Sequence, residues 1–276
     1  MPEYFSSIAG AVITALISWW LGTGAILWLV RLPARRFKTS MTLLTQLWLA
    51  SVLVAAWSMR DDSVLATYAG FVSVIVMWGW HELAFLSGWI TGPRTQPLDE
   101  GATGWRRFQQ SVLVLLYHEL ALVANFLLLW LMQLGQPNPV ALCTFGLLWC
   151  MRLSSKLNLY FGVPHLGEQY LPDGLGYLAS YFRRSRVTAC FYLTMVLSSG
   201  AWLWLVFEVQ RGAMGVTTSW TLLATLLGLA IVEHLLMAFS MPLQRLWGWA
   251  LNTNRSPPGA DLPALPAVLP RSPGPR

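Results

Sequence analysis

The stretch Gly79-Trp80-His81-Glu82-Leu83-Ala84-Phe85-Leu86-Ser87-Gly88 places a histidine and a glutamate side by side within an otherwise apolar segment. The same pairing recurs as Tyr117-His118-Glu119 and, in reversed order, as Glu233-His234. The fourth histidine, His165, is followed three residues later by Glu168. All four histidines of the chain therefore lie within three positions of a glutamate.

The composition gives these pairs their significance. Hydrophobic residues make up 55% of the 276 residues and charged residues only 11%, whereas soluble domains carry about 25% charged residues. This composition is typical of an integral membrane protein. A charged side chain at the centre of a bilayer costs about 2.5 to 3.5 kcal/mol on insertion scales, so ionisable residues inside a span are candidates for function.

Seven apolar segments are long enough to cross the roughly 30 Å hydrocarbon core of a bilayer as helices. They cover residues 8–30, 41–59, 63–90, 108–134, 140–160, 187–207 and 218–241. We therefore predict an all-α, polytopic membrane helix bundle over residues 1–255. Residues 256–276 form a Pro-rich tail that cannot bury enough apolar surface to fold, so we predict disorder there. Residues 161–184 are long for a loop, and their tyrosines and leucines predict burial in the membrane interface.

The basic residues predict the orientation of the bundle. Sixteen of the 18 lysines and arginines fall in segments on one side of the seven spans, and only Arg60 and Arg211 fall on the other. Because cytoplasmic segments are enriched in lysine and arginine, we predict a periplasmic N-terminus and a cytoplasmic C-terminus. Topology also accounts for the net charge of +6, which is no indication of nucleic-acid binding.

The three His-Glu pairs inside the spans share one predicted depth. At 1.5 Å per residue, each lies roughly 13 to 15 Å from the cytoplasmic boundary. Neighbouring residues on a helix point about 100° apart, so a site would have to be built between helices. With imidazole and carboxylate ligands, the expected metals are iron, manganese or zinc. The candidate ligands are His81, Glu82, His118, Glu119, Glu233 and His234, with His165 and Glu168 as further candidates in a loop.

Two other interpretations stand beside the metal site. A histidine could ligate the central metal of a tetrapyrrole, as axial histidines do in haem proteins. Alternatively, each pair could be a buried hydrogen-bonded pair that only fixes helix packing. Arg152 and Lys156, four residues apart in the fifth span, could answer carboxylates of the site or an anionic group of a ligand, or extend to the interface.

Several longer motifs carry a family resemblance. They are His81-Glu82-Leu83-Ala84-Phe85-Leu86-Ser87-Gly88, Thr91-Gly92-Pro93-Arg94, Tyr117-His118-Glu119, Lys156-Leu157-Asn158-Leu159-Tyr160-Phe161-Gly162-Val163-Pro164, Tyr170-Leu171-Pro172 and Leu178-Ala179-Ser180-Tyr181-Phe182. Together they resemble the PuhE-type photosynthetic complex assembly proteins of purple phototrophic bacteria. The resemblance runs from the first span to Glu233-His234 and leaves out the Pro-rich tail.

The resemblance implies an integral protein of the bacterial inner, intracytoplasmic photosynthetic membrane. Such a protein would assist assembly of reaction-centre or light-harvesting complexes, or modulate the supply of bacteriochlorophyll. The implied partners are membrane lipid, reaction-centre or light-harvesting subunits and pigment-synthesis enzymes, and the implied cofactor is bacteriochlorophyll or a precursor. The resemblance supplies no reaction. A membrane-embedded His/Glu metalloenzyme, oxidoreductase-like and acting on a tetrapyrrole, lipid or quinone, therefore stays an alternative, as does a non-catalytic helical scaffold.

Overall fold

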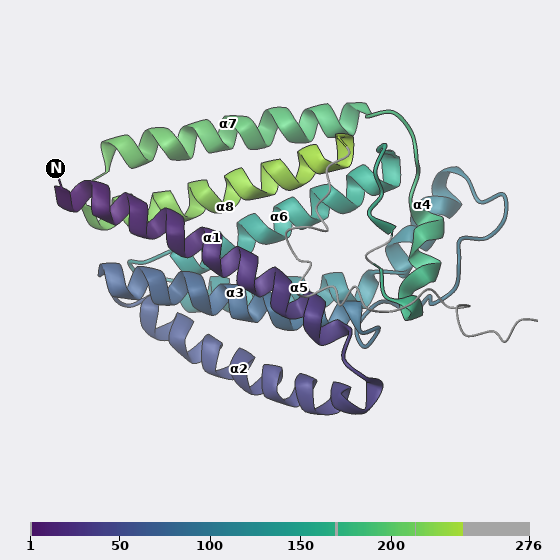
Figure 1. Ribbon diagram of the computed structural model, residues 1–276, viewed down its shortest axis with the longest axis horizontal. Coiled ribbons are helices and arrows are strands. Elements are labelled where there is room, and N and C mark those ends of the chain that lie inside the picture. The colour runs from purple at the N-terminus through teal and green to yellow at the C-terminus, as the bar shows by residue number, and fades with distance from the viewer. Residues whose placement is uncertain (1, 169–170, 213, 240–276) are drawn as a thin grey trace, which may run out of the picture.

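The computed structural model describes residues 2–168, 171–212 and 214–239, which form a bundle of long helices (Figure 1). Seven of these helices are long and apolar enough to cross a membrane, which confirms the predicted all-α membrane bundle. In chain order they are α1 (Pro2–Val30), α2 (Phe37–Ser58), α3 (Val64–Leu86), α5 (Leu116–Gln133), α6 (Val140–Phe161), α7 (Ala189–Arg211) and α8 (Met214–Ala238). Shorter helices are η1 (Ala34–Arg36), α4 (Gly104–Leu113) and η3 (Asp173–Tyr181).

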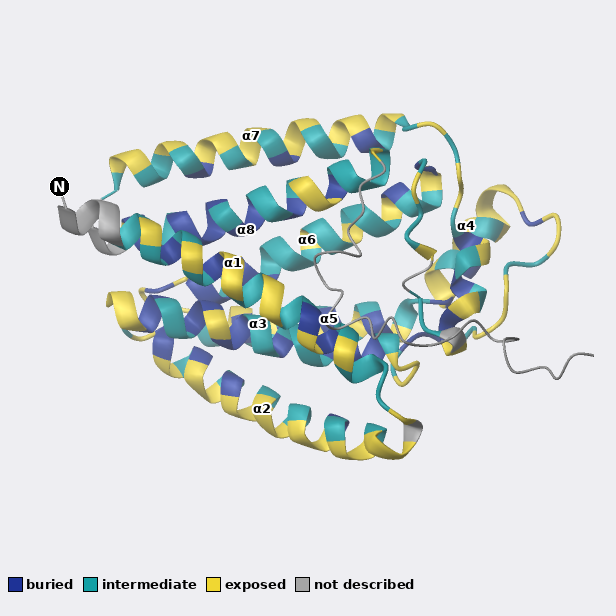
Figure 2. Ribbon diagram, in the orientation of Figure 1, coloured by how far each residue is buried: buried dark blue, intermediate teal, exposed yellow. Residues whose placement is uncertain are grey.

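Helices α3 and α8 are the most enclosed of the seven. About half of the α3 span (50%) and 44% of the α8 span are buried, against 17–22% of the other five. Helix α3 contacts α1, α2, α5, α6 and α8. Helices α2 and α7 lie on the outside of the bundle and turn exposed faces away from it (Figure 2). A residue on α3 is therefore placed to meet side chains from most of the bundle.

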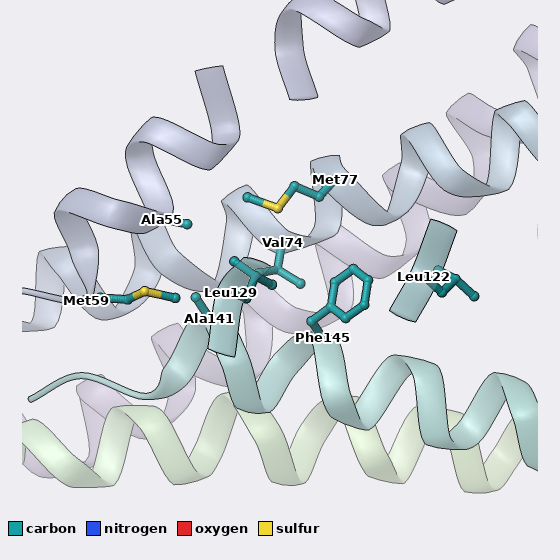
Figure 3. Packing of buried hydrophobic residues seen from close by; sticks show 8 residues of the cluster. All are labelled: Ala55, Met59, Val74, Met77, Leu122, Leu129, Ala141 and Phe145. Carbon is teal, nitrogen blue, oxygen red and sulfur yellow. The ribbon is translucent and has the colours of Figure 1, made fainter. Parts of the chain in front are cut away.

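The core where α2, α3, α5 and α6 meet is apolar and closely packed (Figure 3). Met77 of α3, Leu122 of α5 and Phe145 of α6 are fully buried there. Small residues let the helices approach, as is usual where lipid provides no hydrophobic force between helices. A Cβ atom on Gly70 would lie only 2.8 Å from Ser58 Oγ of α2. This packing fixes the positions of α3 and α6.

The predicted span at residues 108–134 is wrong at its start. The structure has a separate helix α4, a break at Val114 and Leu115, and a spanning helix α5 that begins at Leu116. The cause is the distant segment Thr91-Gly92, which lies against the break. The backbone N–H of His118 donates to Thr91 O at 2.9 Å, so this bond replaces the helical bond to residue 114. The chain from α3 thus interrupts the helix.

The described part of the segment 161–184 packs onto the helix ends. Its 3₁₀ helix η3 buries Leu175, Leu178 and Tyr181 against Phe85 of α3 and Val114. These three of the residues predicted to lie in the membrane interface are therefore buried against protein. We call the loop 87–103, α4 and η3 the cap; α4 lies at the end of the bundle opposite the N-terminus (Figure 1).

The remaining sequence-based statements on the tail and the orientation stay predictions. The Pro-rich tail at residues 256–276 and the end of the helical domain at residue 255 lie outside the described residues, as does Tyr170. The alternation of the spans puts the C-terminal ends of α1, α3, α6 and α8 at one end of the bundle. Which end faces the cytoplasm stays a prediction from the basic residues.

We predict that Gly92→Ala destabilises the junction between α4 and α5. A Cβ atom at this position would lie 2.0 Å from Leu113 O and 2.7 Å from Val114 C, and backbone atoms cannot move aside cheaply. Overpacking of this kind costs about 1–3 kcal/mol. The measurement is the thermal unfolding midpoint in mild detergent. Gly176→Ala, which meets nothing within 4 Å, is the control, and equal midpoints for the two variants would refute the explanation.

Candidate functional site

Two cations on one face of α6 organise the charged residues inside the bundle. Residues four apart on a helix are neighbours on its surface, so Arg152 and Lys156 face the same side. Arg152 forms an ion pair with Glu82 of α3 at 3.0 Å. Lys156 forms a second ion pair with Glu119 of α5. Carboxylates from two helices therefore converge on α6.

The two side chains of the first His-Glu pair contact different helices. His81 is buried, and its Nε2 lies 3.1 Å from Asn125 Oδ1 of α5, which also accepts from Trp48 Nε1 at 2.9 Å. Because an amide oxygen only accepts, Nε2 carries the imidazole proton and Nδ1 is left as a buried acceptor without a partner. Glu82 turns instead to Arg152 on α6.

The two side chains of the second pair also contact different helices. His118 is fully buried, with its ring 4.6 Å from that of Phe85 between centroids, and neither ring nitrogen has a hydrogen-bond partner. Glu119 accepts hydrogen bonds from Lys156 and from Trp149 Nε1, the latter at 3.2 Å. The carboxylate is therefore committed to α6, while the imidazole lies against α3.

The third pair lies on α8. His234 Nδ1 lies 2.8 Å from Ala230 O, and its Nε2 lies 2.8 Å from Ser154 Oγ of α6, whose hydroxyl donates to Met151 O. Glu233 is exposed, and its Oε1 accepts from Trp19 Nε1 of α1 at 2.9 Å. The two side chains again point to different helices.

The two loop candidates, His165 and Glu168, bond to other partners than the three pairs. His165 donates its backbone N–H to Met237 O at 3.0 Å. Glu168 forms an exposed ion pair with Arg184 at 2.6 Å. Neither residue contacts the ion pairs of α6.

The structure does not bring the candidate metal ligands into one donor set. Within residues 2–168, 171–212 and 214–239, no three His, Cys, Asp or Glu side chains are grouped so that they could hold a metal ion. The carboxylates are used by Arg152, Lys156 and Trp19. Iron, manganese or zinc therefore stays a prediction, and we derive no chemistry from it.

A cavity of about 370 Å³ lies between the charged residues and the cap. Its size falls within the range of small-molecule sites, about 300–1,000 Å³. Most of its lining is apolar and comes from five parts of the chain: α3, α6, the α4–α5 junction, η3 and the loop before it. Glu82, Arg152 and Lys156 supply the charged part of the wall. The cavity is thus apolar with one ionic side.

A second cavity of about 240 Å³ lies among α1, α3, α6 and α8. Glu233 and His234 line it, together with Trp19. Glu82 and Arg152 line both cavities. Their ion pair therefore stands at the wall that the two cavities share.

The cap is held by a polar network centred on Asp99. Its carboxylate binds Arg94 at 2.5 Å, Arg106 at 2.7 Å and Gln110 Nε2 at 2.7 Å. These partners lower the pKa of Asp99 from 3.8 to about 2, the hydrogen bond from Arg94 contributing most. Arg94 Nε also donates to Tyr181 Oη of η3 at 2.7 Å. The cap is therefore closed by side chains that are far apart in sequence.

Sequence reasoning did not predict this network. Asp99 and Gln110 lie in and beside a polar segment with no recognisable motif. The one available signal was Arg94 in the Thr91-Gly92-Pro93-Arg94 motif, which is one of the motifs that carry the family resemblance. The pairing depends on how α4 folds back, which the sequence alone does not show.

Comparisons with known proteins extend over nearly the whole chain. Residues 5–258 match a family described as "Protein of unknown function (DUF3623)". The chain is also 34% identical over 265 residues to a protein of Rhodobacter capsulatus described as "Uncharacterized 30.4 kDa protein in puhA 5'region". That match covers 94% of this chain and 96% of the relative. No solved structure matches the chain.

We predict that Lys156→Met lowers stability because it leaves Glu119 without a cation inside the bundle. The pair is partly accessible, with 14% of the lysine and 24% of the glutamate side chain exposed. The expected loss is about 2 kcal/mol, between the values for surface and buried pairs. The double variant Lys156→Met/Glu119→Gln should recover most of it in a double-mutant cycle of unfolding midpoints.

The control for this cycle is Lys38→Met, since Lys38 is exposed at the start of α2. It should change the midpoint little. A double variant no more stable than Lys156→Met would show that the ion pair is not the cause.

We predict that Asp99→Asn opens the cap at neutral pH. The depressed pKa means that the charged carboxylate stabilises the cap above pH 3.8, and that this contribution is lost as pH falls through about 2. Hydrogen exchange in residues 95–110 should therefore be fast in the variant at pH 7. In the unaltered protein the protection, corrected for intrinsic rates, should persist down to about pH 4. Asp62→Asn, an exposed change in the α2–α3 turn, should leave it intact.

Proposed function

The chain belongs to the DUF3623 family, and on that premise we propose that it is an integral membrane factor for assembly of photosynthetic complexes. It would assist reaction-centre or light-harvesting assembly, or modulate bacteriochlorophyll supply, by binding the pigment or a precursor. The proposed binding site is the larger cavity beside Glu82 and Arg152. Membrane lipid, the subunits under assembly and pigment-synthesis enzymes are its proposed partners.

The observation that carries this proposal is the larger cavity itself. It combines a volume of about 370 Å³ with a largely apolar lining and a charged wall. Ligand sites typically combine an apolar surface with a few polar groups that orient the ligand. Three buried residues of the lining, Phe85, Leu178 and Tyr181, come from α3 and the cap, so the cap completes the site.

The photosynthetic context is supported by two separate observations. The motifs from His81 to Phe182 resemble PuhE-type assembly proteins. The relative in Rhodobacter capsulatus is described as a protein in the puhA 5' region. The photosynthetic membrane is accordingly the proposed location of the chain.

In this proposal the apolar lining holds the pigment and excludes water. A bound tetrapyrrole would supply light absorption, and its handling would fall to the residues of this chain. None of the four histidines lines the larger cavity, while His234 lines the smaller one. Axial ligation by histidine is therefore a proposal for the smaller cavity only.

A non-catalytic scaffold is the second candidate. It is favoured because the two side chains of each His-Glu pair contact different helices. Such contacts fix the packing of the helices without any ligand. A metalloenzyme is a third possibility that the same experiment tests.

The experiment is an absorption spectrum and an elemental analysis of the protein purified in mild detergent from its native membrane. Bound bacteriochlorophyll or a precursor would support the proposal. About one or two equivalents of iron, manganese or zinc, lost on substitution of His118 and His234, would favour the metalloenzyme. A folded protein without pigment or metal would favour the scaffold.

We predict that Ser155→Phe removes the co-purified pigment. Ser155 lines both cavities, so a phenyl ring there fills space that the pigment needs. Pigment per protein should fall about tenfold, as expected for a loss of about 1.4 kcal/mol in binding. Cys150→Phe places the same ring on an exposed position of α6 and should retain the pigment. Equal pigment content in both variants would exclude this cavity as the site.

A further inference from the structure

We infer that the larger cavity selects a tetrapyrrole with a free carboxylate over the corresponding ester, an inference that rests on the proposed function. The charged residues of the cavity wall differ in sign. Two cations, Arg152 and Lys156, and one carboxylate, Glu82, line the cavity. Glu119, which neutralises Lys156, is not among the lining residues. The wall thus presents more positive than negative charge to a ligand.

Arg152 uses only part of its hydrogen-bonding capacity. A guanidinium has five N–H donors in a planar fork. Arg152 donates from Nη2 to Glu82 Oε2 at 3.0 Å, and its Nε is buried without a partner. About a third of its side chain, 35%, is exposed, against 15% for Glu82. The terminal N–H groups of Arg152 that do not bind Glu82 therefore stay available at the cavity wall, whereas the buried Nε does not reach it.

Glu82 likewise uses only part of its hydrogen-bonding capacity. Its Oε1 is buried and has no hydrogen-bond partner, so the carboxylate holds Arg152 through one oxygen only. A carboxylate that binds a guanidinium through both oxygens is held more strongly. A ligand carboxylate could therefore bind Arg152 beside Glu82 or in exchange for it.

The apolar part of the lining indicates the chemistry of the rest of the ligand. Apolar side chains such as Leu86, Leu159, Leu171 and Phe182 surround the charged wall. A ligand that fits both parts is mainly apolar and carries one anionic group at its end. A tetrapyrrole acid has this form, whereas its ester lacks the charge that Arg152 and Lys156 would bind. An anionic phospholipid has the same general chemistry, so the test must separate the two.

The experiment uses the full chain in phosphatidylcholine nanodiscs. Pheophorbide a, which has one free carboxylate, and its methyl ester are titrated separately, and binding is followed by quenching of tryptophan fluorescence. The acid should bind at least about tenfold more tightly, the gain expected from one charge-assisted hydrogen bond.

Three variants test whether the charged wall causes the preference for the acid. Arg152→Gln/Glu82→Gln removes both charges of the ion pair together, so neither partner is left uncompensated. Because Lys156 remains in the wall, the variant should lose most, but not all, of the preference for the acid. Glu82→Gln alone should bind the acid more tightly and the ester unchanged. Arg211→Gln, at the far end of α7, is the matched control and should keep the preference.

The outcomes separate the inference from the proposed function. Equal binding of acid and ester would overturn the inference and leave pigment binding standing. Failure of both to bind would overturn both. Displacement of the acid by phosphatidylglycerol in the nanodisc, lost in the double variant, would assign the site to an anionic lipid and also overturn the inference.

Discussion

Charge pairing across α6 is the constraint on which the interior of this bundle depends. A lone carboxylate or ammonium group in a low-dielectric interior is expensive, and removal of one partner from a buried pair leaves that cost uncompensated. Arg152 and Lys156 meet Glu82 from α3 and Glu119 from α5. The rotation of three helices about their own axes is thereby fixed together. The apolar packing around Met77 and Phe145 is compatible with that arrangement, but apolar contacts alone specify rotation less strictly.

The seven spans could be predicted from the sequence because length and apolar composition suffice for a helix that crosses a bilayer. The divergence within each His-Glu pair was also predictable, since adjacent positions on a helix point in different directions. The partner of each side chain was not. That Glu82 meets Arg152 while His81 meets Asn125 depends on the order of helices around α3, which no local pattern encodes.

The break between α4 and α5 shows the same limit in the backbone. The residues around Val114 and Leu115 are apolar and contain neither proline nor glycine, so a continuous helix was the reasonable prediction. The interruption comes from Thr91-Gly92, whose carbonyl takes the N–H of His118. A local propensity was overridden by a contact between segments more than twenty residues apart. The cap, and with it one side of the larger cavity, follows from this interruption.

The order of charges along the chain has a consequence for biosynthesis. Both carboxylates, Glu82 and Glu119, precede the cations of α6 in the sequence, and synthesis proceeds from the N-terminus. Spans α3 and α5 therefore emerge from the ribosome before Arg152 and Lys156 exist. Until α6 follows, each acid must stay protonated, hydrated or beside the insertion machinery. Insertion of α6 is thus the step that allows α3 and α5 to reach their final packing.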